Sequence, residues 1–69
     1  MEFKCRLKVI FAERDIKIGE FADTVGINRS TLSLIVNGKT LPNFTNAYMI
    51  SRKLQVPIEK IWILQAENK

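Results

Sequence analysis

The chain has 69 residues, 46% of them hydrophobic and 26% charged, and a formal net charge of +4. This length predicts one small domain over residues 1–69, and the composition is typical of a folded protein rather than a disordered one. There is no histidine, the single cysteine cannot form an internal disulfide, and no apolar run approaches the ~20 residues that cross a bilayer.

These features exclude several classes of function. Without histidine, clustered carboxylates or a glycine loop that could hold phosphate, we expect no catalysis, no metal, no cofactor and no small-molecule ligand. The N-terminus is charged and lacks the apolar segment of a signal peptide. We therefore expect a complete protein that works in the cytoplasm without a membrane.

The positive charge is unevenly distributed along the chain. Five basic residues balance five acidic ones in residues 1–23, and two balance two in residues 59–69. The segment 24–58 contains no acidic residue, and its basic residues are Arg29, Lys39, Arg52 and Lys53. A polyanionic partner such as nucleic acid explains this asymmetry, although so few charges could also fall this way by chance.

The first predicted helix begins at residue 3 or 4 and ends at Arg14. Its inward positions recur at i, i+3 and i+4 and are Leu7, Ile10 and Phe11. Phe3 extends this stripe by one turn at the start. Asp15 is expected to end the helix, because aspartate is among the few side chains that tolerate the left-handed conformation.

Two short helices joined by a tight turn are predicted between residues 17 and 38. The apolar positions of the first recur at i, i+3, i+4 and i+7 and are Ile18, Phe21, Ala22 and Val25. Gly26 breaks this pattern, since glycine tolerates the positive φ of a helix end, and Asn28 follows as an N-cap. The second helix is expected from Arg29 to Asn37, with Gly38 at its C-terminus.

This second helix has two chemically different faces. At about 100° per residue, one side is apolar and consists of Leu32, Ile35 and Val36, with Thr31 at its edge. The opposite arc carries Arg29, Ser30, Ser33, Leu34 and Asn37. Such side chains can fork onto guanine, bind phosphate or meet a thymine methyl. From this helix alone, a face that is simply exposed to solvent is an equally good explanation of these residues.

Two more helices are predicted after a short connection. Pro42 cannot continue a helix, and Asn43 can cap a fourth helix over residues 44–54. The inward positions of that helix are Phe44, Ala47, Ile50 and Leu54. Pro57 opens a fifth helix, from residue 58 to about residue 65, whose anchors are Ile58, Ile61 and Trp62. Residues 66–69 are expected to fray.

The ordered set of these features resembles the Cro/CI-type (XRE-like) helix-turn-helix family of phage and bacterial transcriptional regulators. The matching residues are FA at 21–22, VGINRST at 25–31, Ser33, NGK at 37–39, Pro42, the apolar spacing of the fourth helix and QVP at 55–57. The likeness covers roughly residues 5–64. It implies an all-α, five-helix lambda-repressor-like domain with its helix-turn-helix at about 17–38.

The resemblance also implies a function and a set of contacts. A Cro-like repressor would bind a palindromic operator in double-stranded DNA as a homodimer, through the major groove. Matched onto this sequence, the base contacts would be Arg29, Ser30 and Leu34, with Asn28 and Thr31 as further candidates. The contacts to the DNA backbone would be Lys17, Ser33, Asn37, Lys39 and Thr40. For Asn28 a plain N-cap, and for Asn37 a plain end of the helix, are equally good explanations.

Some positions depart from the family pattern. Ile18 stands where many relatives have a glutamine that binds DNA, and we expect it to pack instead. Phe11 and Val36 stand where several phage members pair an arginine with a glutamate. Exchanging both charges for packed apolar groups is often neutral or stabilising. Gln55 stands where a glycine often ends the fourth helix.

The C-terminal third is the predicted dimer contact, through Ile61, Trp62, Ile63 and Leu64. Adjacent residues cannot all face the core, so at least one apolar side chain should be exposed there and offer a partner surface. We expect a two-fold dimer near residues 58–64, weak in free solution and completed on DNA; packing against Phe3 and Leu7 is the alternative. A rival function is a protein-interaction module, such as an antitoxin or an anti-repressor partner.

Overall fold

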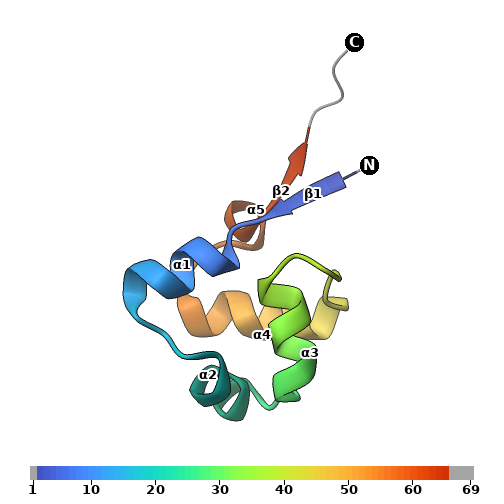
Figure 1. Cartoon of the computed structure of the whole chain (residues 1–69). Coiled ribbons are helices and arrows are strands. Elements are labelled where there is room, and N and C mark those ends of the chain that lie inside the picture. Colours follow the sequence, from blue (N-terminus) through green and yellow to red (C-terminus); the bar gives the residue numbers. More distant parts are fainter. Residues whose placement is uncertain (1, 66–69) are drawn as a thin grey trace.

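A computed structural model describes residues 2–65 and shows five α-helices framed by two short strands (Figure 1). The helices are α1 (Leu7–Arg14), α2 (Ile18–Val25), α3 (Arg29–Val36), α4 (Phe44–Leu54) and α5 (Ile58–Ile61). Strand β1 (Glu2–Cys5) precedes α1, and β2 (Trp62–Gln65) follows α5. The expectation that residues 66–69 fray lies outside the described residues.

The two ends of the described chain correct the all-α prediction. Residues 2–5 do not extend α1, and residues 62–65 do not extend α5; they pair as an antiparallel ribbon in which Phe3 is opposite Leu64 and Cys5 is opposite Trp62. At the base of the ribbon, the amide of Arg6 donates to the carbonyl of Ile61 at 2.9 Å. Pairing satisfies backbone groups that a single extra turn at either helix end would leave unbonded. The domain is therefore mostly helical with one small sheet.

The ends of the middle helices follow the predicted local chemistry. The Asn28 side chain caps α3 by accepting from the amides of Ser30 and Thr31, at 2.8 and 3.3 Å. Asn43 caps α4 in the same way, through the amide of Asn46 at 2.8 Å. These two caps confirm the predicted starts of α3 and α4.

Two helices end on left-handed residues that are not glycine. Asp15 has φ 57° at the end of α1, as predicted, and Gln55 has φ 59° at the end of α4. The carbonyls of Ala12 and Phe11 accept from the Asp15 amide, so the last turn of α1 is closed. Gln55 takes up the conformation that a glycine would adopt more easily, at a cost of about 1–2 kcal/mol.

All five helices and strand β2 contribute to the core, which is entirely apolar among the described residues. It consists of Leu7, Ile10, Phe11, Phe21, Ala22, Ile27, Leu32, Ile35, Val36, Ala47, Ile50, Leu54, Ile61 and Trp62. The rings of Phe11 and Phe21 meet edge to face, with centroids 5.0 Å apart. Phe11 and Val36 are both buried, as expected for an exchanged pair of apolar residues.

Two residues predicted to face the core are exposed instead. Phe44 is 77% exposed, because it is the first residue of α4 and lies beyond the part of the helix that the core covers. Its ring stacks on Tyr48 one turn later, with the centroids 6.1 Å apart. Phe3 is 42% exposed, since β1 carries it out along the ribbon.

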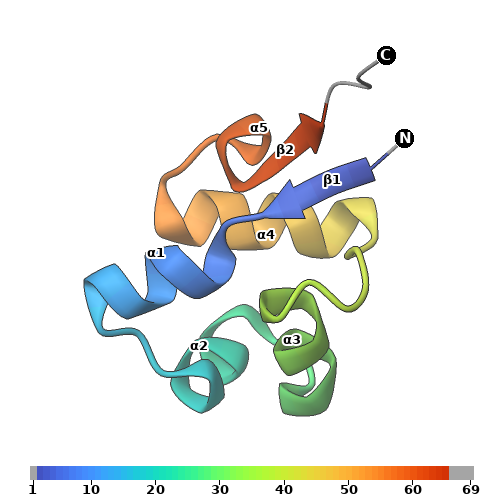
Figure 2. The same ribbon diagram turned by 45° about the horizontal axis from the view of Figure 1, so that its top comes forward.

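The elements separate into two ends of the molecule. Both views place α2 and α3 together at one end, while the ribbon projects from the other, with α1 and α4 between them (Figures 1 and 2). Within residues 2–65, every helix is too short or too polar to pass through a lipid bilayer. The projecting end of the ribbon therefore points away from α2 and α3.

Candidate nucleic-acid interface

The turn between α2 and α3 is fixed by glycine and by one buried side chain. Gly26 has φ 73°, and its amide donates to the carbonyl of Ala22 at 2.9 Å. The next amide, from Ile27, donates to the same carbonyl at 3.0 Å, and the Ile27 side chain is buried. This combination of a left-handed residue and an apolar anchor sets the direction in which α3 leaves the turn.

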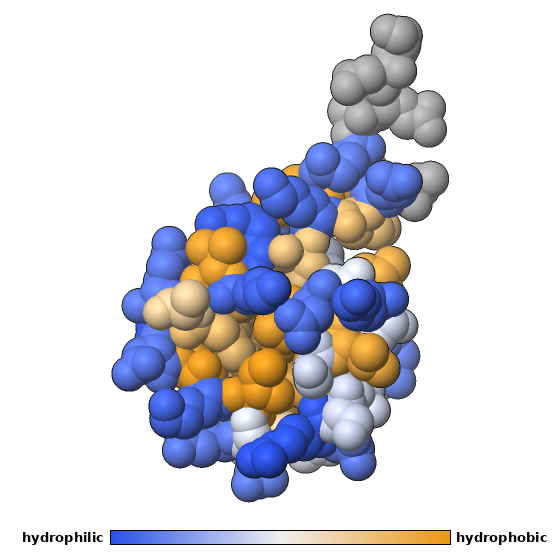
Figure 3. Space-filling model, in the orientation of Figure 1, coloured by the Kyte–Doolittle hydropathy of each residue, from blue (hydrophilic) through white to orange (hydrophobic). Residues whose placement is uncertain are grey.

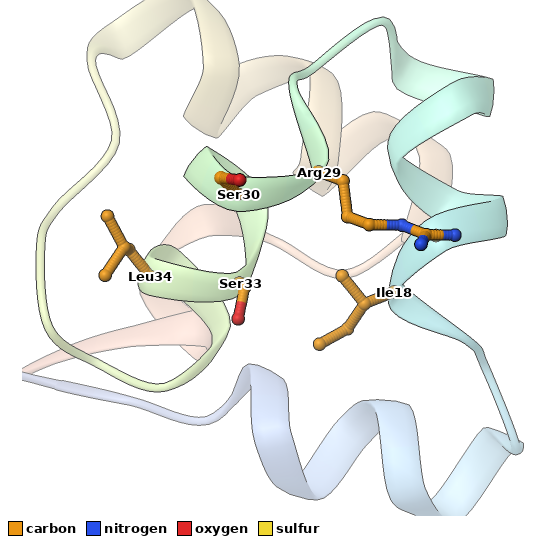
Figure 4. A pocket seen from close by; sticks show the side chains of 6 residues that line it. Ile18, Arg29, Ser30, Ser33 and Leu34 are labelled. Carbon is orange, nitrogen blue, oxygen red and sulfur yellow. The ribbon is translucent and has the colours of Figure 1, made fainter.

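The outward face of α3 brings together the three principal base-contact candidates. Arg29, Ser30 and Leu34 line one open hollow with Ser33 of α3 and with Ile18 and Gly19 of α2 (Figure 4). Leu34 is 50% exposed although its helix neighbours Ile35 and Val36 are buried. Thr31 is also exposed but does not line this hollow.

The two helices contribute differently to the hollow. The Arg29 side chain extends from the first turn of α3 toward α2, while Leu34 lies at the other end of the lining (Figure 4). Ile18 packs partly against the core and also faces the hollow. In the space-filling view, this end of the molecule exposes apolar residues among hydrophilic ones (Figure 3). Such a mixed surface can hydrogen-bond base edges and also meet a methyl group.

Three of the candidates for contact with the DNA backbone directly precede or follow the two helices in the sequence. Lys17 is exposed immediately before α2, and Lys39 and Thr40 are exposed after α3. The amide of Lys39 donates to the carbonyl of Leu34 at 2.9 Å, which holds the chain close to the end of α3. An exposed lysine therefore precedes α2 and another follows α3.

Asn28 and Asn37 have structural roles that limit what else they can do. The carbonyl oxygen of the Asn28 side chain is already an acceptor for two amides, so only its amino group remains free. The Asn37 amino group donates to the backbone oxygen of Ser33 at 2.9 Å and approaches the Ser33 hydroxyl at 3.4 Å. Both residues form the ends of α3.

The four residues expected at a dimer contact are not equally accessible. Ile61 and Trp62 belong to the core, Ile63 is half-buried, and Leu64 is 52% exposed. The exposure of Leu64 confirms that an apolar side chain remains outside the core. Ile61 and Trp62 contribute little exposed surface, at 0% and 6%, because only the distal half of β2 leaves the core.

An apolar groove that the sequence did not indicate lies beside the ribbon. Its lining residues are Phe3, Leu41, Pro42, Phe44, Ala47, Ile58, Glu59 and Trp62. Leu41 is 57% exposed and Phe44 is 77% exposed. The available signal was Leu41 beside Pro42, since a large apolar residue in a connecting loop has no helix stripe to join.

The thiol of Cys5 is a structural group. It donates to the carbonyl of Ile35 at 3.4 Å. Burial raises the pKa of the Cys5 thiol and outweighs the opposing effects of the Leu7 backbone and the Trp62 indole, so the thiol stays protonated near neutral pH. The buried Trp62 Nε1 has no partner at hydrogen-bonding distance and angle, so its influence on the sulfur is that of a nearby dipole. Within residues 2–65, no group of three His, Cys, Asp or Glu side chains could hold a metal ion.

Comparison with known proteins agrees with this geometry. Residues 7–61, from the start of α1 to the end of α5, match the helix-turn-helix family. A protein of Archaeoglobus fulgidus, described as an uncharacterized HTH-type transcriptional regulator, is 33% identical over 65 residues, which are 94% of this chain and 92% of that protein. With its capped α3, its glycine turn and a match over most of its length, this chain belongs to the Cro/CI-type (XRE-like) helix-turn-helix family of transcriptional regulators.

Proposed function

We propose that this chain is a sequence-specific, Cro-like repressor that acts in the cytoplasm on a palindromic operator. The observation that carries the proposal is the outward face of α3, where Arg29, Ser30 and Leu34 line one hollow while the opposite face is buried. An α-helix fits the major groove of B-DNA, and the base edges there form a distinct pattern for each base pair.

The three side chains suit different base edges. The Arg29 guanidinium can donate two parallel hydrogen bonds to the O6 and N7 atoms of guanine. The exposed Leu34 can pack against a thymine methyl, and the Ser30 hydroxyl can donate to or accept from several bases. Each well-formed bidentate contact discriminates against a wrong base by about 1–3 kcal/mol.

The surrounding residues would hold α3 in the groove. Lys17 before α2 and Lys39 after α3 are exposed cations at the ends of the two helices, and we propose that each pairs with a phosphate beside the inserted helix. The hydroxyls of Ser33 and Thr40 and the amide of Asn37 can donate to phosphate oxygens. Because these contacts are the same for every sequence, they would contribute affinity and register rather than discrimination.

A single α3 reads too few base pairs to select one operator in a genome, so we propose that two copies bind together. The exposed ribbon residues Phe3 and Leu64, with Leu41 and Phe44 beside the groove, form an apolar surface on the described chain. Its burial against a second copy would be favourable at about 25 cal/mol per Å². The two α3 helices would then enter successive major grooves about 34 Å apart.

The test is binding to random-sequence duplex DNA at 50 and 200 mM salt, followed by selection of preferred sequences. A dimer that makes about six phosphate contacts should lose roughly 10³-fold in affinity between these concentrations. Selection should then return a sequence with two-fold symmetry. Weak binding that does not depend on salt would refute the proposal.

The apolar groove supports one alternative function. Phe44 and Leu41 are large, exposed and adjacent to that groove, which suits a protein partner equally well. An antitoxin or an anti-repressor partner on this fold would show little DNA binding at either salt concentration. Measuring binding to random-sequence duplex DNA at the two salt concentrations therefore separates the two functions.

A further inference from the structure

Gly19 lies in the first turn of α2, directly beneath the Arg29 side chain. An ideal Cβ placed on Gly19 would overlap Nη2 of Arg29 and lie only 2.6 Å from Cζ and 2.8 Å from Nε. The guanidinium therefore rests on the Gly19 backbone, in the space that any other side chain would occupy. Figure 4 shows the Arg29 side chain extending from α3 toward α2.

The backbone at this position does not itself need glycine. Gly26 and Gly38 have positive φ values of 73° and 74°, whereas Gly19 is an ordinary helical residue. Glycine inside a helix is destabilising relative to alanine, because its chain loses more freedom on folding. Glycine at residue 19 therefore matters because it has no side chain, which leaves space for the Arg29 guanidinium, and not because of its φ.

We propose that Gly19 determines specificity by acting through Arg29, an inference that rests on the proposed DNA-reading function. The bare backbone of α2 supports the guanidinium and aims it, so the side chain loses less freedom when it pairs with a base. Ile18 lines the same hollow and has no acceptor that could compete for the guanidinium donors. Gly19 is thus a positioning residue, and Arg29 makes the contact.

A methyl group at residue 19 must displace the guanidinium. Carbon atoms in ordinary contact are about 3.5–4.0 Å apart, so Cζ would have to retreat by about 1 Å or more from its 2.6 Å position. The two hydrogen bonds of a guanine contact tolerate only about 2.7–3.2 Å. Gly19→Ala should therefore break at least one of them and lower the preference for guanine by roughly tenfold.

The experiment compares Gly19→Ala with Thr24→Ala in the full chain. Thr24 is exposed in the last turn of α2, where its hydroxyl donates to the carbonyl of Glu20 at 3.0 Å, away from Arg29. Thermal unfolding and base preference from random-duplex selection are measured for both. We expect a higher melting temperature for Gly19→Ala, together with loss of preference at one base pair of each half-site. Thr24→Ala should keep the parental preference at every position.

A second arm tests whether the effect passes through Arg29. In an Arg29→Ala background, adding Gly19→Ala should change no base preference, because the displaced group is already gone. A further loss in that background, an unchanged preference in Gly19→Ala, or equal weakening on all sequences would each overturn the role of Gly19. If the parent chain itself shows no sequence preference, the proposed DNA function fails first. Nuclear Overhauser contacts between Arg29 and Gly19 would then show whether the guanidinium lies against Gly19 independently of that function.

Discussion

Val36→Glu should destabilise this domain strongly, while the same change two residues earlier should not. Val36 is 4% exposed, and its partners in the core are all apolar. A glutamate there has no buried cation to meet, and such an uncompensated charge costs about 3–5 kcal/mol. A chain of this length has a total stability of about 3–10 kcal/mol, so the change removes a large part of it.

Leu34→Glu is the matched control, because Leu34 lies on the same helix but is 50% exposed. Substitutions at such surface positions usually change stability by about 0.5 kcal/mol or less. In a domain of this size, 1 kcal/mol shifts the melting temperature by about 4–8 °C. The lower ends of both ranges give a difference of about 10 °C between the two variants in circular dichroism melts, and the upper ends give more. Equal melting temperatures would refute the assignment of Val36 to the core.

Three further experiments test the interface, the dimer and the thiol. Arg29→Ala should cost about 1–3 kcal/mol at one base position of each half-site, whereas Lys39→Ala should weaken binding to all sequences and reduce the salt slope by about one per bound copy; equal losses on specific and random duplex would make Arg29 a phosphate contact. Leu64→Glu should prevent self-association in sedimentation experiments with little change in the monomer's melting temperature, because Leu64 is 52% exposed; unchanged association would exclude the ribbon as the dimer contact. The folded-state pKa of Cys5 is raised above its ordinary value of 9.0, so the stability it contributes is complete below that pH and is lost as the pH rises through the folded-state pKa. Cys5→Ser should flatten this alkaline decline in urea titrations, and an identical decline in both proteins would contradict it.

The sequence predicted the middle of the fold well because its signals there are local. The starts of α3 and α4 depend on Asn28 and Asn43, each of which accepts from amides two or three residues later. The end of α1 depends on the tolerance of Asp15 for a left-handed conformation. Such information lies within one helical turn and needs no knowledge of the tertiary structure.

The ribbon could not be predicted in this way. Strands β1 and β2 are separated in the sequence by all five helices, so their pairing is not a local signal. Each strand has only four residues, which are too few to distinguish the alternation of a strand from the end of a helix. Phe44 was misassigned for a related reason, since a helical stripe does not show where the neighbouring core stops. The role of Gly19 could not be predicted, because the sequence does not show that the Arg29 side chain occupies the space beside this glycine.

The pairing of β1 with β2 also orders events during protein synthesis. Strand β1 leaves the ribosome first, but its partner β2 follows only after all five helices have been made. Closing so long a loop is slow compared with forming local helices. A nascent chain that has emerged only as far as α4 therefore already contains the α2–α3 pair, whereas the ribbon cannot yet exist. On a growing chain, the helices proposed to meet DNA are made before the ribbon that would meet a second copy.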